Sequence, residues 1–326
     1  MKKNFICLCL LLFIGYILFF PRDAVAAAAR GLLLWYERVL PALLPFAILS
    51  NILIYSGYLN SINRLLSPLV RWILPVSGNG AFVTLSGFLF GFPMGSKNCA
   101  ELLKCHQLDK NEADVLFAIT NNISPVFVSG YILSQQLAWS ASLPFLSGIS
   151  LLILYLPPLL AGRMLLMHTR HKAQSGSGDA VHRSQKDSGT IKRPASESKM
   201  TFKIIDAGIM NGFETLTRLG GYIMLFSILA SMLSKLPFSP LQTLILTGIT
   251  EITNGISLLP DAALPEGTKY ILAMGFTAFG GLSGIAQTSS MISGTGLSLR
   301  RYCLIKLMLT ACTLALAFFV TICPGF

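Results

Sequence analysis

Residues 87–98 read GFLFGFPMGSKN and lie in an apolar run that opens at Ala81. Three glycines and a proline fall within nine residues of this stretch, which ends on Ser96, Lys97 and Asn98. Glycine and proline weaken or interrupt the hydrogen-bonded backbone of a helix. Broken backbone is tolerated inside a bilayer only within protein or beside a wet cavity. The stretch therefore predicts a broken helical hairpin with a polar tip, a candidate substrate site. The alternative is a glycine-rich face on which helices pack closely.

The composition indicates a polytopic membrane protein. Of the 326 residues, 53% are hydrophobic and 12% are charged, whereas soluble proteins carry about 25% charged residues. The net charge of +11 does not require a nucleic-acid partner, because the basic residues gather in one loop and at the ends of apolar segments. The positive-inside rule accounts for that distribution. We expect an all-α protein in the lipid bilayer, with no nucleic-acid partner.

Further apolar segments lie on both sides of the hairpin. Residues 1–23 predict a first transmembrane helix with its N-terminus in the cytoplasm, and a cleaved signal peptide is the alternative. Residues 63–74 predict a short amphipathic helix at the membrane surface. Residues 169–200 are polar and basic, which predicts a disordered cytoplasmic linker. The other spans are predicted at residues 31–58, 143–167, 202–233 and 302–322, the first two of which contain prolines.

Three more apolar segments are interrupted by polar residues or glycines. They are residues 115–133 with Asn121 to Pro125 inside, residues 241–259 with TGITEITNGIS at 247–257, and residues 270–290 with GGLSGIAQTSS from Gly280. The order of a long span, two broken segments and a clean span therefore occurs twice, in residues 30–168 and 201–326. The positive-inside rule gives the two halves opposite orientations. We therefore predict an inverted-topology repeat with two broken or re-entrant helical hairpins, the architecture of secondary transporters.

The broken segments supply the candidate substrate-binding residues. Lys97 would attract a carboxylate, and a lysine that snorkels to the interface is the alternative. Glu251 would carry a coupling proton or pair with Lys97, and a purely structural ion pair is the alternative. The polar side chains would hydrogen-bond a substrate, or else only join helices to one another. The full set is Gly91, Pro93, Gly95, Ser96, Lys97, Asn121, Asn122, Ser124, Glu251, Thr253, Asn254, Gln287 and Ser289.

Enzyme and metal signatures are absent from the sequence. The seven cysteines and four histidines show no paired metal-ligand spacing. There is no metalloprotease motif and no phosphate-binding loop. We therefore expect a protein that is not an enzyme, holds no metal or cofactor, and draws any active transport from an ion or substrate gradient. The sequence leaves open whether the chain forms a homo-oligomer.

Several motifs together resemble one family. GFLFGFPMGSK at 87–97 resembles the GxPxG[AS]K signature of the YlbJ-type (SpoVV-like) sporulation integral membrane proteins, within the nucleoside-recognition or gate domain group. LPALLPF at 40–46, TNNISPVF at 120–127, EITNG at 251–255 and GFTAFGGLS at 275–283 agree with it. The resemblance covers roughly residues 30–320 without the linker. Asn122 departs from the small Thr or Ser expected there.

The resemblance implies a function that the residues by themselves do not show. It implies a multi-pass membrane protein that moves a small carboxylate, dipicolinic acid, out of the mother cell across the outer forespore membrane during sporulation. A transporter of a nucleoside-like solute and a non-transporting membrane scaffold or assembly factor are the alternatives.

Overall fold

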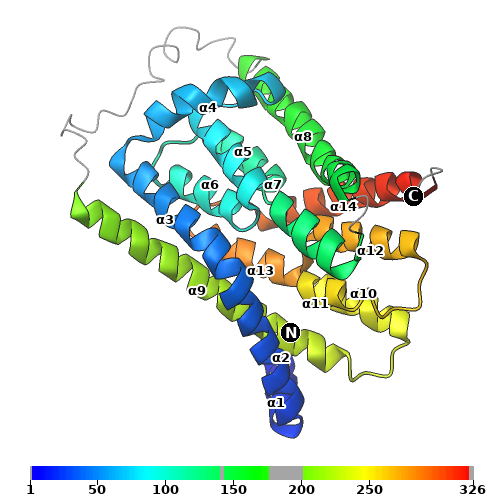
Figure 1. Cartoon of the computed structure of the whole chain (residues 1–326). Coiled ribbons are helices and arrows are strands. Elements are labelled where there is room, and N and C mark those ends of the chain that lie inside the picture. The colour runs from blue at the N-terminus through cyan, green and yellow to red at the C-terminus, as the bar shows by residue number, and fades with distance from the viewer. Residues whose placement is uncertain (1, 140–142, 176–200, 323–326) are drawn as a thin grey trace.

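The computed structural model describes residues 2–139, 143–175 and 201–322, and all regular structure in these residues is helical (Figure 1). Five helices in this part of the chain are long and apolar enough to cross a membrane. The predicted all-α polytopic membrane fold is confirmed. The five candidate spans are Pro21–Ser56, Pro144–Arg170, Phe202–Leu233, Glu266–Met291 and Leu299–Ile322.

The span predicted at residues 31–58 begins earlier in the structure, at Pro21. Helices α2 (Pro21–Leu34), η1 (Trp35–Val39) and α3 (Leu40–Ser56) follow one another without a gap. Helix α1 (Lys2–Phe19) contributes only a shorter apolar stretch, Ile6–Phe19, whereas a crossing helix needs about 20 residues.

The predicted surface helix is present as α4 (Leu59–Ile73), which has an apolar and a polar face. It bends by 77° into the next helix, and the two together count as a sixth candidate span. Helix α8 (Leu143–Ser175) takes in the first residues of the predicted linker. Residues 176–200 lie outside the described part of the chain.

The long spans of the two halves pack along each other. Helix α9 (Phe202–Leu233) lies against α2 and α3, as Figure 1 shows. Small residues allow this approach: a Cβ atom at Gly212 would lie 2.8 Å from the Ile48 side chain, and one at Gly220 would lie 2.8 Å from Trp35. The Trp35 indole donates a hydrogen bond to the Leu216 carbonyl at 2.7 Å. Close approach at small residues is how helices associate in membranes.

Both predicted hairpins are broken helices. The first consists of α5 (Gly78–Phe90) and α6 (Met94–Lys104), and the second of α10 (Pro240–Thr250) and α11 (Ile252–Ser257). The first break requires glycine at position 91, where φ is +81° and a Cβ atom would lie 2.7 Å from the Ser124 nitrogen. The second break is the single extended residue Glu251. Re-entry of these hairpins into the membrane stays a prediction.

Two further breaks complete the pattern. Helix α7 (Lys110–Ile119) is separated from η2 (Phe127–Gln136) by an irregular stretch from Thr120 to Ser124. Helix α12 (Glu266–Phe279) is separated from α13 (Gly281–Met291) by Gly280. The last span, α14 (Leu299–Ile322), is continuous. The polar interruptions read from the sequence therefore coincide with real breaks.

Contacts between loops agree with the predicted topology. The Lys110 ammonium donates to the Gly296 carbonyl at 2.6 Å. The positive-inside rule predicts the cytoplasm for both loops, from Lys104 and Lys110 in one and from Arg300 and Arg301 after the other. Lys235 pairs with Asp23 at 2.6 Å, and each stands at the end of a predicted span, residues 202–233 and 1–23, that begins in the cytoplasm. The side of the membrane that each group faces stays a prediction.

We expect cysteines placed at Asn111 and Gln135 to be labelled from opposite sides of the membrane. Both side chains are exposed, at the two ends of the α7–η2 segment. The measurement is labelling by a membrane-impermeant maleimide in a cysteine-free background, with Ser298→Cys as a marker for the Asn111 side. If Asn111 and Gln135 react from the same side, the predicted topology and the inverted repeat are wrong.

Candidate functional site

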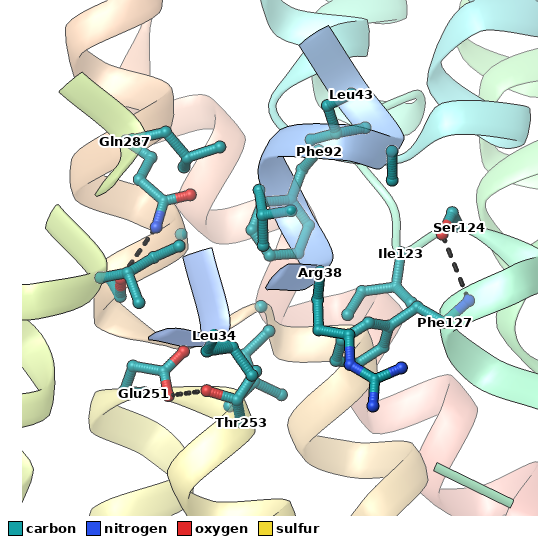
Figure 2. Close-up of a pocket in the computed structure, with 18 of the residues that line it drawn as sticks. Leu34, Arg38, Leu43, Phe92, Ile123, Ser124, Phe127, Glu251, Thr253 and Gln287 are labelled. Carbon is teal, nitrogen blue, oxygen red and sulfur yellow. Dashed lines mark hydrogen bonds between the residues drawn. The ribbon is translucent and has the colours of Figure 1, made fainter. Parts of the chain in front are cut away.

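One cavity of about 120 Å³ is lined by residues from all four helix breaks. Phe92, Ser124, Glu251 and Gly280 supply one lining residue from each break. Figure 2 shows Phe92 in the middle of the view, with Glu251 and Thr253 on one side and Ser124 and Phe127 on the other. The breaks are far apart in sequence and belong to both halves of the chain. The fold therefore gathers its irregular backbone around one place.

Hydrogen bonds satisfy the backbone at these breaks. The Ser124 hydroxyl accepts a bond from the Phe127 N–H at 3.3 Å, at the start of the following helix. The Glu251 carboxylate accepts bonds from the Thr253 hydroxyl and from the Asn254 N–H, and so caps α11. Such partners allow irregular backbone to persist among membrane helices.

The lining is mostly apolar and aromatic, with a few polar groups. Phe92 and Phe127 present aromatic rings, and Gln287 and Ser283 contribute polar side chains. The Gln287 amide donates to the Ser283 hydroxyl at 2.9 Å, and its Oε1 atom is buried without a hydrogen-bond partner. An apolar pocket with a few placed polar groups is the usual form of a small-molecule site.

Arg38 supplies a positive charge that was not among the predicted site residues. It lies on η1, near the middle of the helix Pro21–Ser56, and lines the cavity. The residue is exposed, and its guanidinium makes no hydrogen bond or ion pair with any described residue. A π-helical turn such as η1 is frequent at functional sites. The signal in the sequence was a charged residue inside an apolar span.

Lys97 does not reach the cavity. Its side chain is only 5% exposed, and its ammonium donates to the Asn51 amide oxygen on α3. Asn51 in turn donates to the Gly208 carbonyl at 3.2 Å and to Asn211 at 3.0 Å. Among the described residues Lys97 forms no ion pair with Glu251, so the expected pairing is absent. Lys97 instead joins the first hairpin to α3 and α9.

The other predicted residues divide between the cavity and helix packing. Asn121 donates to Thr288 at 2.7 Å and to Tyr302 at 2.8 Å, and Asn254 donates to Ser227 at 3.1 Å, so these amides join helices. Four predicted residues line the cavity, namely Ser124, Glu251, Thr253 and Gln287. Nine do not line it: Gly91, Pro93, Gly95, Ser96, Lys97, Asn121, Asn122, Asn254 and Ser289.

The glycines of the first hairpin confirm close packing as well. A Cβ atom would lie 2.2 Å from the Thr120 carbonyl oxygen at Gly87 and 2.5 Å from it at Gly95. The end of α7 therefore lies against both limbs of the hairpin, next to the break at Gly91. The packing alternative holds for these two residues, while the break itself opens on the cavity.

We expect Gly95→Ala to destabilise the protein by about 2–3 kcal/mol, because the new methyl group must displace backbone and not a side chain tip. Gly221→Ala is the matched control, since no atom lies within 4 Å of its Cβ position on α9. Thermal unfolding of both variants in detergent measures the difference. Equal unfolding temperatures would show that the hairpin accommodates the extra volume.

Comparison with known proteins supports the motif-based resemblance. Residues 37–133 match the family model Gate, described as nucleoside recognition. The chain is 28% identical to the sporulation integral membrane protein YlbJ of Bacillus subtilis (strain 168), over 88% of this chain and 75% of that protein. The predicted resemblance is confirmed. No solved structure matches the chain.

The Gate match contains most of the cavity lining that comes from the first half of the chain. It includes Arg38, the first hairpin with Phe92, and the α7–η2 break with Ser124. Glu251, Gly280 and Gln287 lie beyond it, in the second half of the chain. The cavity is therefore formed by the matched segment together with a part of the chain that the Gate model does not cover.

Proposed function

We propose that this chain is a membrane transporter of a small carboxylate, dipicolinic acid, which it moves out of the mother cell across the outer forespore membrane during sporulation. The observation that carries the proposal is the convergence of four helix breaks on one cavity. Discontinuous helices that meet between two halves are the usual place for a transporter substrate. The resemblance to a sporulation integral membrane protein supports the cellular setting.

Reciprocal contacts between the halves support a repeat. Helix α6 of the first half contacts α13 of the second half, and α11 of the second half contacts η2 of the first half. Likewise α7 contacts α14, and α12 contacts α8. The predicted repeat makes α6 the counterpart of α11, η2 of α13, α7 of α12 and α8 of α14. Each contact between the halves therefore occurs a second time between the counterpart elements. A pseudo-two-fold relation between the halves requires this pattern, and such repeats can rock against each other around a fixed site.

The chemistry of the cavity favours a planar anion. Dipicolinate is a pyridine ring that carries two carboxylates. Arg38 offers the fork geometry that suits a carboxylate, and Phe92 and Phe127 offer aromatic surfaces for the ring. The Glu251 carboxylate lines the same cavity and would repel a dianion. We therefore propose that Glu251 carries a proton while the anion passes.

A nucleoside-like solute is the second candidate. The observation in its favour is the Gate match, whose description is nucleoside recognition. Ser124, Thr253 and Gln287 could hydrogen-bond such a neutral solute. For that substrate the charge of Arg38 would matter little, and the polar side chains would decide affinity.

Uptake into vesicles separates these candidates. Labelled dipicolinate and labelled uridine would be compared in the same proteoliposomes, with protein-free liposomes as the control. Saturable uptake of dipicolinate that unlabelled dipicolinate inhibits, and uridine does not, supports the proposal. Uptake of uridine alone would replace it with the nucleoside function. Uptake of neither solute would favour the scaffold.

A further inference from the structure

Lys306 is a buried cation in a span that is otherwise apolar around it. It lies two turns into α14 and is 2% exposed. Tyr302, Leu309, Thr313 and Ala317 are the other buried residues of this helix, at the spacing of one face. An ionisable residue inside a membrane span is costly to place and usually functional.

The Lys306 ammonium joins the two breaks that lie outside the hairpins. It donates to the Asn122 amide oxygen at 3.3 Å, in the α7–η2 break, and to the Ala278 carbonyl at 3.2 Å, just before Gly280. The Asn122 carbonyl accepts the Phe92 N–H at 2.6 Å, and Phe92 lines the cavity. One charge therefore connects the two halves of the chain directly behind the cavity wall.

No carboxylate among the described residues pairs with this ammonium. Several charged side chains of the helices packed against α14 have other partners: Lys110 bonds Gly296, Glu112 accepts from Ser77, Arg163 bonds Ile73, and Lys269 pairs with Glu266. Asp114 on α7 and Arg170 on α8 form no ion pair with Lys306. The positive charge of the Lys306 ammonium is instead stabilised by two neutral oxygens. One of them is a carbonyl in the last turn of α12, where the helix dipole is negative.

These two oxygens are of the kind that coordinates monovalent cations. In transporters built from discontinuous helices, unwound backbone carbonyls and the C-terminal ends of half-helices coordinate the coupling ion. Asn122 and Ala278 provide one amide oxygen and one such carbonyl, from two different breaks. Here the positive charge between them belongs to the chain itself.

We propose that Lys306 is a tethered cation, which permanently fills a monovalent-cation site between the α7–η2 and α12–α13 breaks. On the proposed transport function, the cycle then needs no dissociable cation at this junction. Removal of the lysine side chain empties the site and leaves its oxygen ligands facing one another. The emptied site would take a small monovalent cation such as Na⁺.

The test is thermal unfolding of purified protein in sodium chloride and in choline chloride. We expect the wild-type unfolding temperature to be the same in both salts. Lys306→Ala should unfold several degrees lower in choline chloride and recover with rising sodium concentration, because a ligand bound only by the folded state stabilises it. Lys306→Gln should be destabilised without sodium rescue, because its amide still occupies the site. Lys269→Ala is the control lysine, with no expected sodium response.

Three results would overturn the tethered cation: sodium stabilisation of the wild type, indifference of folded Lys306→Ala to sodium, or failure of that variant to fold in saturating sodium. None of these depends on transport. Dipicolinate counterflow in sodium-free vesicles tests the proposed function separately. Absence of dipicolinate counterflow in the wild type both with and without sodium would reject the transport function and leave the unfolding result to stand on its own.

Discussion

Arg38→Gln is expected to lower dipicolinate uptake about 100-fold, while Arg38→Lys keeps part of it. A hydrogen bond to a charged group contributes about 1.5–3 kcal/mol, and about 2.7 kcal/mol corresponds to a factor of about 100. Arg38 lines the cavity and has no partner among the described residues, so its guanidinium is available to a substrate. Initial uptake rates in vesicles, measured with protein amount held equal, give the comparison.

Lys97→Gln is the matched control for this prediction. The Lys97 ammonium donates to Asn51 and does not line the cavity, so its loss should lower stability more than substrate affinity. If Lys97→Gln abolishes uptake in folded protein and Arg38→Gln spares it, the substrate site lies at the tip of the first hairpin. If Arg38→Gln leaves dipicolinate uptake unchanged, the anion does not bind at this cavity.

The breaks were predictable because their causes are local. Gly91 and Pro93 interrupt the first hairpin where the sequence predicts it, and the polar residues before Pro125 interrupt the next segment. Backbone conformation depends on the residue itself and its neighbours in sequence. Glu251 and Gly280 were likewise inside segments predicted to be broken. Helix α9 has the bounds of its predicted span.

The assignment of side chains to the cavity was less predictable, because it depends on helices far apart in sequence. Lys97 lies one turn into α6, where it meets Asn51 on another helix. Asn121 and Asn122 are in the predicted break, yet their amides meet Tyr302 and Lys306 on α14. The sequence around Asn121 and Asn122 does not identify hydrogen-bond partners that lie about 180 residues away. Arg38 could have been found, because its charge stands inside an apolar span.

The glycine-rich hairpin is both a broken helix beside the cavity and a face for close helix packing. Gly87 and Gly95 allow the end of α7 to lie against both limbs, and that contact brings Ser124 to the break at Gly91. Without this close packing the two breaks of the first half could not share a cavity. The close packing at the glycines therefore positions the irregular backbone whose residues line the cavity.

Glu251→Gln is expected to keep dipicolinate uptake and to make it independent of high pH. In the wild type we expect uptake to decline at high pH, where Glu251 loses its proton. Two unit charges 4 Å apart repel each other by about 4 kcal/mol at an effective dielectric constant of about 20, which is close to a factor of 1,000 in affinity. A charged Glu251 in the same cavity as a dianion would therefore prevent binding, and glutamine imitates the protonated carboxyl. The amide oxygen of glutamine can still accept from Thr253 and Asn254, so the cap of α11 is retained.

Two variants separate this electrostatic effect from structural loss. Glu251→Ala removes the cap and should lower stability by about 1–2 kcal/mol, with reduced uptake at every pH. Glu37→Gln changes an exposed carboxylate that does not line the cavity, and it should leave the pH profile of uptake unchanged. The measurement is the initial rate of uptake as a function of pH, equal on both sides of the vesicle membrane. If Glu251→Gln keeps the wild-type pH profile, or loses uptake as Glu251→Ala does, then Glu251 acts through the helix cap and does not carry the proton.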